Sequence, residues 1–232
     1  MKKIILFFLL FINVALFSQE IVKPKVEVDS LYREDQFYFN ISYNSLVNKP
    51  SGFGQNKFST GLSIGFLRDM PFNKKRTWAV ALGFGYGLSI LNHNLLSGEI
   101  PNINDADSYK YISGNLDFDK NKHALHFVEF PLEIRWRNST PDSHKFWRIY
   151  TGFKVSYLFF DRYKFSNASQ ETLTFSNPDL NKIQYGVYTT FGFNTFNFYV
   201  YYGLNPIFKT GQINNENIKF SPLNFGLQFY IL

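Results

Sequence analysis

The sequence predicts an all-β fold, an antiparallel barrel of about eight strands, and three observations support this prediction. Apolar residues recur at every second position in about eight segments, which is the period of a strand with one apolar face. The connections between these segments differ systematically in length. The chain ends on LNFGLQFYIL, in which every second residue from Leu223 to Ile231 is apolar, whereas the ends of soluble chains are usually polar and frayed.

Each predicted strand is defined by its alternating apolar positions. Phe, Tyr and Trp make up 20% of the chain, and aromatic residues favour strands. The segments, in order, are residues 37–43, 58–66, 78–90, 128–136, 147–159, 183–193, 196–204 and 223–231.

The connections separate into two classes, which predicts a barrel in a membrane. Short turns follow the second, fourth and sixth segments, and longer connections follow the others, above all residues 92–124 and 161–182. Short turns at one end, long polar loops at the other and both chain ends on the short-turn side are typical of outer-membrane barrels. We therefore expect an antiparallel transmembrane β-barrel in the bacterial cell outer membrane.

The first residues fit this location. Residues 1–18 combine a short basic start with an apolar run that is too short to span a bilayer as a helix, and this is the pattern of a cleaved signal peptide. We expect residues 19–33 to form a periplasmic tail and residues 34–232 to form the barrel. The chain has no Cys, which excludes disulfides and thiolate metal sites.

Charge gives no reason to expect nucleic acid as a partner. Without residues 1–18, 22 Lys and Arg (24 less Lys2 and Lys3) stand against 18 Asp and Glu, a modest excess for about 214 residues. The expected partners are outer-membrane lipid and the barrel-assembly machinery.

Glycine and tryptophan positions distinguish the two faces of the predicted strands. All ten strand glycines fall on the face opposite the apolar one, where side chains converge inside a narrow barrel. Trp78, Trp136 and Trp147 lie on the apolar face, within a few residues of a short turn. They predict an aromatic girdle at the periplasmic interface.

The final segment predicts strand closure and an assembly signal. We expect it to pair with the first strand, which would explain why it does not fray. The spacing of Asn224, Gly226, Phe229 and Ile231 also resembles the C-terminal signal that the barrel-assembly machinery recognises, although the chain stops on Leu232 and not on an aromatic residue.

The middle of the chain resembles the PorT-like outer-membrane barrels. These carry a strand of the form aromatic–x–Glu–x–Pro, then a turn and a Gly-containing strand; here Glu129, Pro131 and Gly152 occupy the matching positions. The resemblance implies a small porin-like barrel and a link to protein secretion or gliding motility such as the founding member has. It also implies other envelope or secretion proteins as partners. On residues alone, Pro131 predicts a β-bulge, because proline cannot donate to a strand ladder.

Charged residues gather on the predicted inner face of two neighbouring strands, and they include Glu129, Glu133, Arg135, Arg148 and Lys154. In one register Glu129 would face Lys154; in another, shifted by two, Glu133 would face Arg148. Charges enclosed in a narrow lumen must be paired. The cluster is therefore interpreted either as a structural plug or as a gate or proton path.

Function remains open between three classes. The first is a non-catalytic barrel that acts as scaffold, assembly factor or surface-binding module through its long loops. The second is a small-solute channel. The third is a lipid-modifying enzyme with His126 at the rim, although no Ser or carboxylate pattern accompanies that residue. We expect no catalytic residues, no metal and no cofactor.

Overall fold

Thirteen strands are present in the described part of the computed structural model, which covers residues 35–55, 57–96, 112–113, 119–138, 146–167, 170–213 and 216–231. The predicted signal peptide and tail, residues 1–33, lie outside it. The strands are β1 Gln36–Val47, β2 Thr60–Pro71, β3 Trp78–Asn92, β4 Leu95–Leu96, β5 Ile112–Ser113, β6 Lys120–Arg137, β7 Trp147–Asn167, β8 Gln170–Phe175, β9 Ile183–Phe193, β10 Phe196–Gly203, β11 Gln212–Ile213, β12 Glu216–Asn217 and β13 Ser221–Ile231.

Eight of these strands close into an antiparallel barrel, as predicted. The order is β1, β2, β3, β6, β7, β9, β10 and β13. The ring closes because β13 pairs with β1, in a register that sets Phe39 opposite Phe229 and Tyr43 opposite Phe225. No helix in the described residues is long and apolar enough to cross a membrane.

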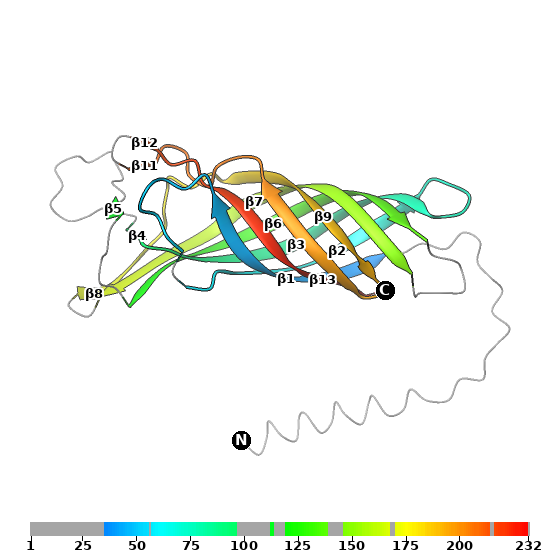
Figure 1. Ribbon diagram of the computed structural model, residues 1–232, viewed down its shortest axis with the longest axis horizontal. Helices are drawn as coiled ribbons and strands as arrows, with labels where there is room; N and C mark the ends of the chain where they lie inside the picture. Colours follow the sequence, from blue (N-terminus) through cyan, green and yellow to red (C-terminus); the bar gives the residue numbers. More distant parts are fainter. Residues whose placement is uncertain are drawn as a thin grey trace, which may run out of the picture. The chain divides into compact units, whose positions relative to one another are not determined.

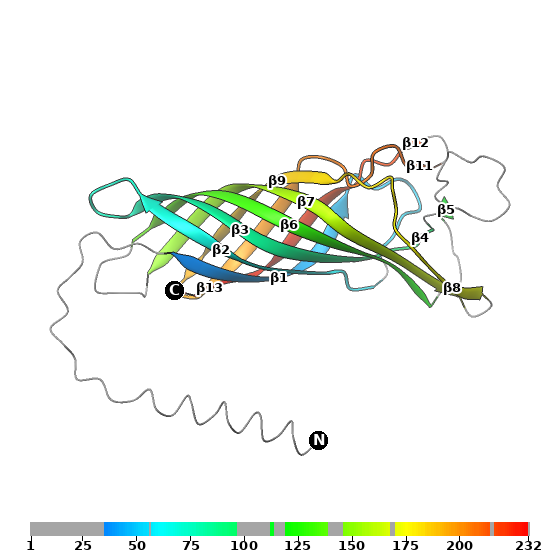
Figure 2. The same ribbon diagram turned by 180° about the vertical axis from the view of Figure 1, so that it is seen from behind.

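The barrel has two distinct ends, visible from both sides in Figures 1 and 2. At the turn end, β2–β3, β6–β7 and β9–β10 are joined by the shorter connections, and β13 ends there. At the loop end lie the small strands β4, β5, β8, β11 and β12. This is the predicted segregation, in which the turn end faces the periplasm.

Side-chain direction follows the predicted alternation. Large apolar residues such as Phe84, Leu132 and Ile149 are exposed on the outside, where they would meet lipid. Tyrosines fill the inside, and seven of those in the described residues are at most 5% exposed: Tyr38, Tyr150, Tyr163, Tyr188, Tyr199, Tyr201 and Tyr230. Glycines make room for them: a Cβ at Gly85 would collide with the Tyr38 hydroxyl.

The β6–β7 hairpin differs from prediction in two ways. Residues 92–124 and 161–182 are not all loop, because β6 already begins at Lys120 and β7 continues to Asn167, where it pairs beyond the other strands with β8. Moreover, the register on β3 is the same on both sides of Pro131, so the predicted bulge is not there. The register shift lies at His126 and Phe127, where Phe159 of β7 is the extra residue.

The bulge exchanges the two faces of β7. Before it, Tyr157 and Phe159 point outward; after it, Phe160, Arg162 and Lys164 do, while Asp161, Tyr163 and Phe165 are buried. A single extra residue has this effect because side chains alternate with period two.

Candidate functional site: the filled lumen and its outer cap

The turn end of the lumen holds a buried group of charges, here called the ionic network: Asp69, Glu133, Arg135 and Arg137. Asp69 is bound to both arginines, at 3.0 Å from Arg135 Nη1 and 2.8 Å from Arg137 Nη2. Glu133 Oε2 lies 2.7 Å from Arg135 Nε. All four side chains are fully buried, so their charges are stable only because they are paired.

Asp69 was missed as a site residue in the sequence. The sequence pattern assigns Asp69 to the short turn, because Met70 and Pro71 follow it in a polar stretch that is typical of a loop. The structure extends β2 to Pro71, and this aims Asp69 into the lumen opposite Ala81. The signal available was alternation: Leu67 and Asp69 continue the inner face of β2 while Arg68 and Met70 are exposed.

The predicted partners of Glu133 and Arg148 were wrong. In the observed register Glu133 lies opposite Gly152, and Arg137 opposite Arg148. Glu133 pairs along its own strand with Arg135, and it accepts a hydrogen bond of 2.6 Å from the Tyr188 hydroxyl. Arg148 is buried and has no ion pair within the described residues; its guanidinium lies 4.5 Å from the Phe146 ring centroid, a cation–π contact.

Glu129 and Lys154 form the second level of the lumen, here called the central pair. Glu129 Oε1 and Lys154 Nζ are 2.8 Å apart. The predicted pairing of Glu129 with Lys154 is therefore confirmed as an ion pair, although the register sets Lys154 opposite Pro131 and the two residues meet diagonally. Lys154 also lies 3.3 Å from the Tyr199 hydroxyl and over the Tyr201 ring. The pair and its tyrosines cross the barrel near its middle.

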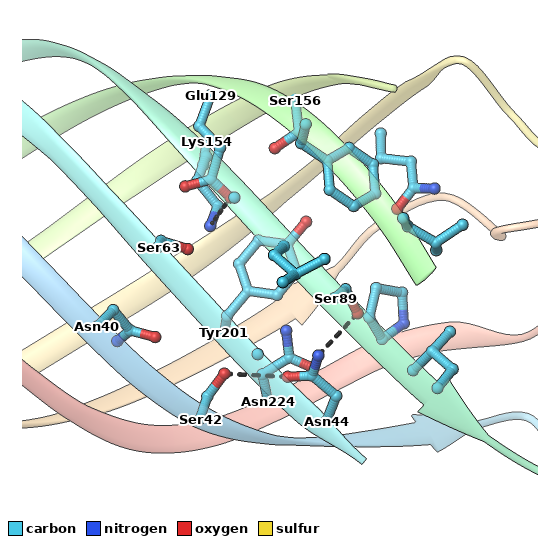
Figure 3. A pocket seen from close by; sticks show the side chains of 18 of the residues that line it. Asn40, Ser42, Asn44, Ser63, Ser89, Glu129, Lys154, Ser156, Tyr201 and Asn224 are labelled. Carbon is cyan, nitrogen blue, oxygen red and sulfur yellow. Dashed lines mark hydrogen bonds and ion pairs between the residues drawn. The ribbon is translucent and has the colours of Figure 1, made fainter. Parts of the chain in front are cut away.

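A small polar cavity of about 50 Å³ lies on the loop side of the central pair (Figure 3). Hydroxyl and amide groups line it. Asn44 bridges two of them, because its amide nitrogen donates to Ser89 Oγ at 2.7 Å and its oxygen accepts from Ser42 Oγ at 3.0 Å. Such a cavity is polar and large enough to hold water.

An apolar cluster, here called the outer cap, covers this cavity at the loop end. It joins inward residues of the strand ends to residues of the connections: Leu46, Leu91, Leu95, Leu125, Phe127, Leu158, Leu180, Ile207, Phe208, Ile218 and Phe220. Leu91, Leu125 and Ile207 also line the cavity. The connections are held in place by backbone bonds, such as Ile207 to Phe220 at 2.9 Å.

Two buried histidines lie against the outer cap. The Leu95 amide donates to His93 Nδ1 at 3.2 Å, so His93 Nε2 carries the proton that it donates to His123 Nδ1 at 3.3 Å. Burial lowers the pKa of His93 to about 4. His93 is therefore neutral at ordinary pH, as its apolar surroundings require.

The other predicted residues are placed as follows. Trp78 and Trp136 are direct cross-strand partners on the outer surface near the turn end, and Trp147 is exposed at the same end. In β13, Asn224 lines the cavity, Gly226 faces the lumen, and Phe229 and Ile231 point outward. His126 is on the lipid-facing side, with its Nδ1 2.7 Å from the Tyr86 hydroxyl.

The three PorT-like motif positions all serve lumen packing. Glu129 belongs to the central pair and Pro131 is buried. A Cβ at Gly152 would lie 2.6 Å from the Leu132 carbonyl oxygen and 2.9 Å from the Tyr188 ring. Among the described residues, no group of three or more side chains is arranged to hold a metal ion.

Replacing Glu133 by alanine is expected to destabilise the barrel by about 3 kcal/mol, toward the lower end of the cost of breaking a buried pair, because Arg135 keeps its contact with Asp69. Urea unfolding in detergent, followed by tryptophan fluorescence, measures this. Tyr188→Phe is the control: it removes only the hydrogen bond to Glu133 and should cost less. A Glu133→Ala barrel with unchanged unfolding would mean that the network is hydrated.

Comparison with known proteins places the chain in a family. The family model described as "Outer membrane protein beta-barrel domain" matches residues 17–209. Among solved structures, Ail, the attachment invasion locus protein of Yersinia pestis, is similar over 87% of this chain and 100% of that chain. The complex with the heparin analogue sucrose octasulfate gives a TM-score of 0.41 at 12% identity, and a second structure gives 0.40 at 13%.

No curated protein matches the chain. The family model covers most of the sequence and describes a beta-barrel domain, and the structure is a closed barrel of eight strands. The chain therefore belongs to the outer membrane protein beta-barrel domain family and is a protein of the bacterial outer membrane.

Proposed function

We propose that this protein is a non-catalytic outer-membrane barrel that acts as a scaffold, assembly factor or surface-binding module through its loop end. The observation that carries the proposal is the filled lumen. The ionic network, the central pair and the outer cap lie one after another along the barrel. Between the central pair and the outer cap they leave a cavity of about 50 Å³. A barrel built in this way presents surfaces and not a passage.

The contacts of His126 support a non-catalytic role. Its ring lies 5.2 Å from Phe160 and 6.3 Å from Phe159, in addition to its bond with Tyr86. This is an aromatic group on the lipid-facing surface, of the kind that membrane proteins place at the interface. The PorT-like positions support a further proposal, that the partners are envelope or secretion proteins, and the C-terminal positions support recognition by the barrel-assembly machinery.

The purified protein should form no stable pore. In planar bilayers we expect no steady conductance, because the ionic network, the central pair and the buried tyrosines fill the lumen and the apolar outer cap covers its loop end. Protein inactivated by heating in SDS is the control for artefacts of detergent. Stable and reproducible single-channel steps from the folded protein would contradict the scaffold proposal and favour a small-solute channel.

Capture in cells tests the loop end as an interaction surface. Because the chain has no Cys, one cysteine carrying a photo-crosslinker can be introduced at a chosen position. Lys209 is exposed at the loop end and Lys74 at the turn end. The proposal expects specific protein adducts from Lys209→Cys that Lys74→Cys does not give; the same adducts from both, or none from loop-end positions, would count against it.

A further inference from the structure

A cluster of basic side chains lies on the outside of the barrel near the loop end, here called the basic patch: Lys122, Arg162 and Lys164. Lys122 of β6 lies directly opposite Lys164 of β7, and Arg162 lies opposite Ala124 in the adjacent row. Like charges placed directly across a strand pair destabilise it. None of the three forms an ion pair with a carboxylate of the described residues. The neighbours of the lysine pair in the same row, Asn92 and Thr174, are uncharged.

The bulge in β7 is what aims Arg162 and Lys164 of this patch outward. Without the extra residue Phe159, the alternation would turn Arg162 and Lys164 into the barrel and Asp161 out of it. In the structure Asp161 is buried, where it accepts hydrogen bonds of 2.7 Å from both the Ser176 hydroxyl and the Asn177 amide. β-Bulges commonly re-aim side chains at functional positions. Here one bulge separates the basic residues from the one acidic residue of this segment.

The patch lies just above the depth at which lipid tails end. Trp136 marks the periplasmic interface on β6, and His126 is ten residues further along. At ~3.3 Å per residue and a tilt of ~40°, this distance spans ~25 Å, the height of the apolar band of such barrels. Lys122 is a further ~10 Å out by the same arithmetic. Tyr86, His126, Phe159 and Phe160 form the aromatic group below it.

We propose that the basic patch binds phosphate groups of outer-leaflet lipid headgroups. Lysine and arginine are the residues that bind phosphate, arginine in a bidentate manner. Lys122 and Lys164 are half-buried, so their apolar stems rest on the strand surface while the ammonium groups reach outward. A bound phosphate between them would relieve their mutual repulsion. This inference does not depend on the function proposed for the loop end.

The test measures binding of bis-phosphorylated lipid A to the full-length barrel in detergent, by native mass spectrometry. Lys122→Gln/Lys164→Gln removes the patch pair. Lys74→Gln/Lys75→Gln, which removes two exposed lysines at the turn end, is the matched control. Each lysine near an anionic surface strengthens binding about fivefold, so the patch variant should bind lipid A roughly 20-fold more weakly than wild type. The turn variant should bind lipid A as wild type does.

Three further arms identify the ligand. Dephosphorylated lipid A should bind wild type and patch variant equally and weakly, and inorganic phosphate alone should not compete at millimolar concentration. Equal binding of phosphorylated lipid A by wild type and patch variant would overturn the proposal. So would displacement of the lipid by soluble polyphosphate at the same phosphate concentration, because the patch would then be a general anion site.

Discussion

Asp69→Ala should destabilise the barrel more than any other single substitution in the lumen. Asp69 holds two guanidinium groups at once, and both are fully buried. Breaking a buried pair costs about 3–5 kcal/mol, and here one substitution removes contacts to Arg135 and Arg137 together. We expect the loss of stability to lie at or above the upper end of this range, and to be larger than the loss caused by Glu133→Ala. The reason is that Arg135 loses its contact with Asp69 and Arg137 loses both of its contacts with Asp69.

Tryptophan fluorescence during urea unfolding is a suitable measurement, because Trp78, Trp136 and Trp147 all lie at the turn end. Asp69→Asn keeps the size of the side chain and removes its charge, so it should fall between wild type and Asp69→Ala. Asp119→Ala removes a carboxylate from an exposed residue and should stay within about 0.5 kcal/mol of wild type. If Asp69→Ala unfolded at the same urea concentration as Asp119→Ala, the ionic network would not be a stabilising element.

The barrel itself could be predicted because its alternation has no competing signal. In β3 and β10 the apolar face is uninterrupted, because these residues meet lipid along the whole length that crosses the membrane. Trp78 and Trp147 could likewise be placed, because a short turn fixes their depth. Closure by β13 followed from the same logic: a strand with an apolar face at the chain end needs a partner on each side.

The features that were missed lie where alternation changes sign or stops. The doublet Phe159–Phe160 breaks the period. Beyond it the outer face carries Arg162 and Lys164 and the inner face carries Asp161, and this mixture of charges resembles a loop in the sequence. The inward position of Asp69 was missed for a similar reason, because the nearby proline makes its segment resemble a turn. The outer cap could not be predicted, because Leu180, Phe208 and Phe220 come from connections whose packing depends on long-range contacts.

The register of the charged strands also required the structure. Glu129 and Lys154 meet diagonally, and a shift of two residues would preserve every face while exchanging the partners. The register is set by the whole hairpin, including the Trp136–Ile149 and Arg137–Arg148 pairings at the turn end. Local charge pattern alone therefore left the alternatives open.

Deleting residues 223–232 should abolish assembly in the outer membrane. This removes almost all of β13, which pairs with β1 on one side and β10 on the other. Both strands would then present unpaired backbone groups to lipid, each costing several kcal/mol. The measurement is the amount of heat-modifiable protein in purified outer membranes. Normal levels of the truncated protein would refute the role of β13 in closure.

Point substitutions in β13 distinguish the role of this strand in closing the barrel from the role of its lipid-facing apolar side chains. Phe225 is exposed near mid-depth, between Tyr43 and Val200, so Phe225→Lys should cost about 2–4 kcal/mol. Phe229 lies beside Phe196 at the turn end, with ring centroids 5.3 Å apart, so Phe229→Asp should cost only about 1 kcal/mol in stability. If Phe229→Asp nevertheless reduced assembly as strongly as the deletion, while Phe229→Leu did not, the loss would arise in recognition of the C-terminal strand and not in the stability of the folded barrel.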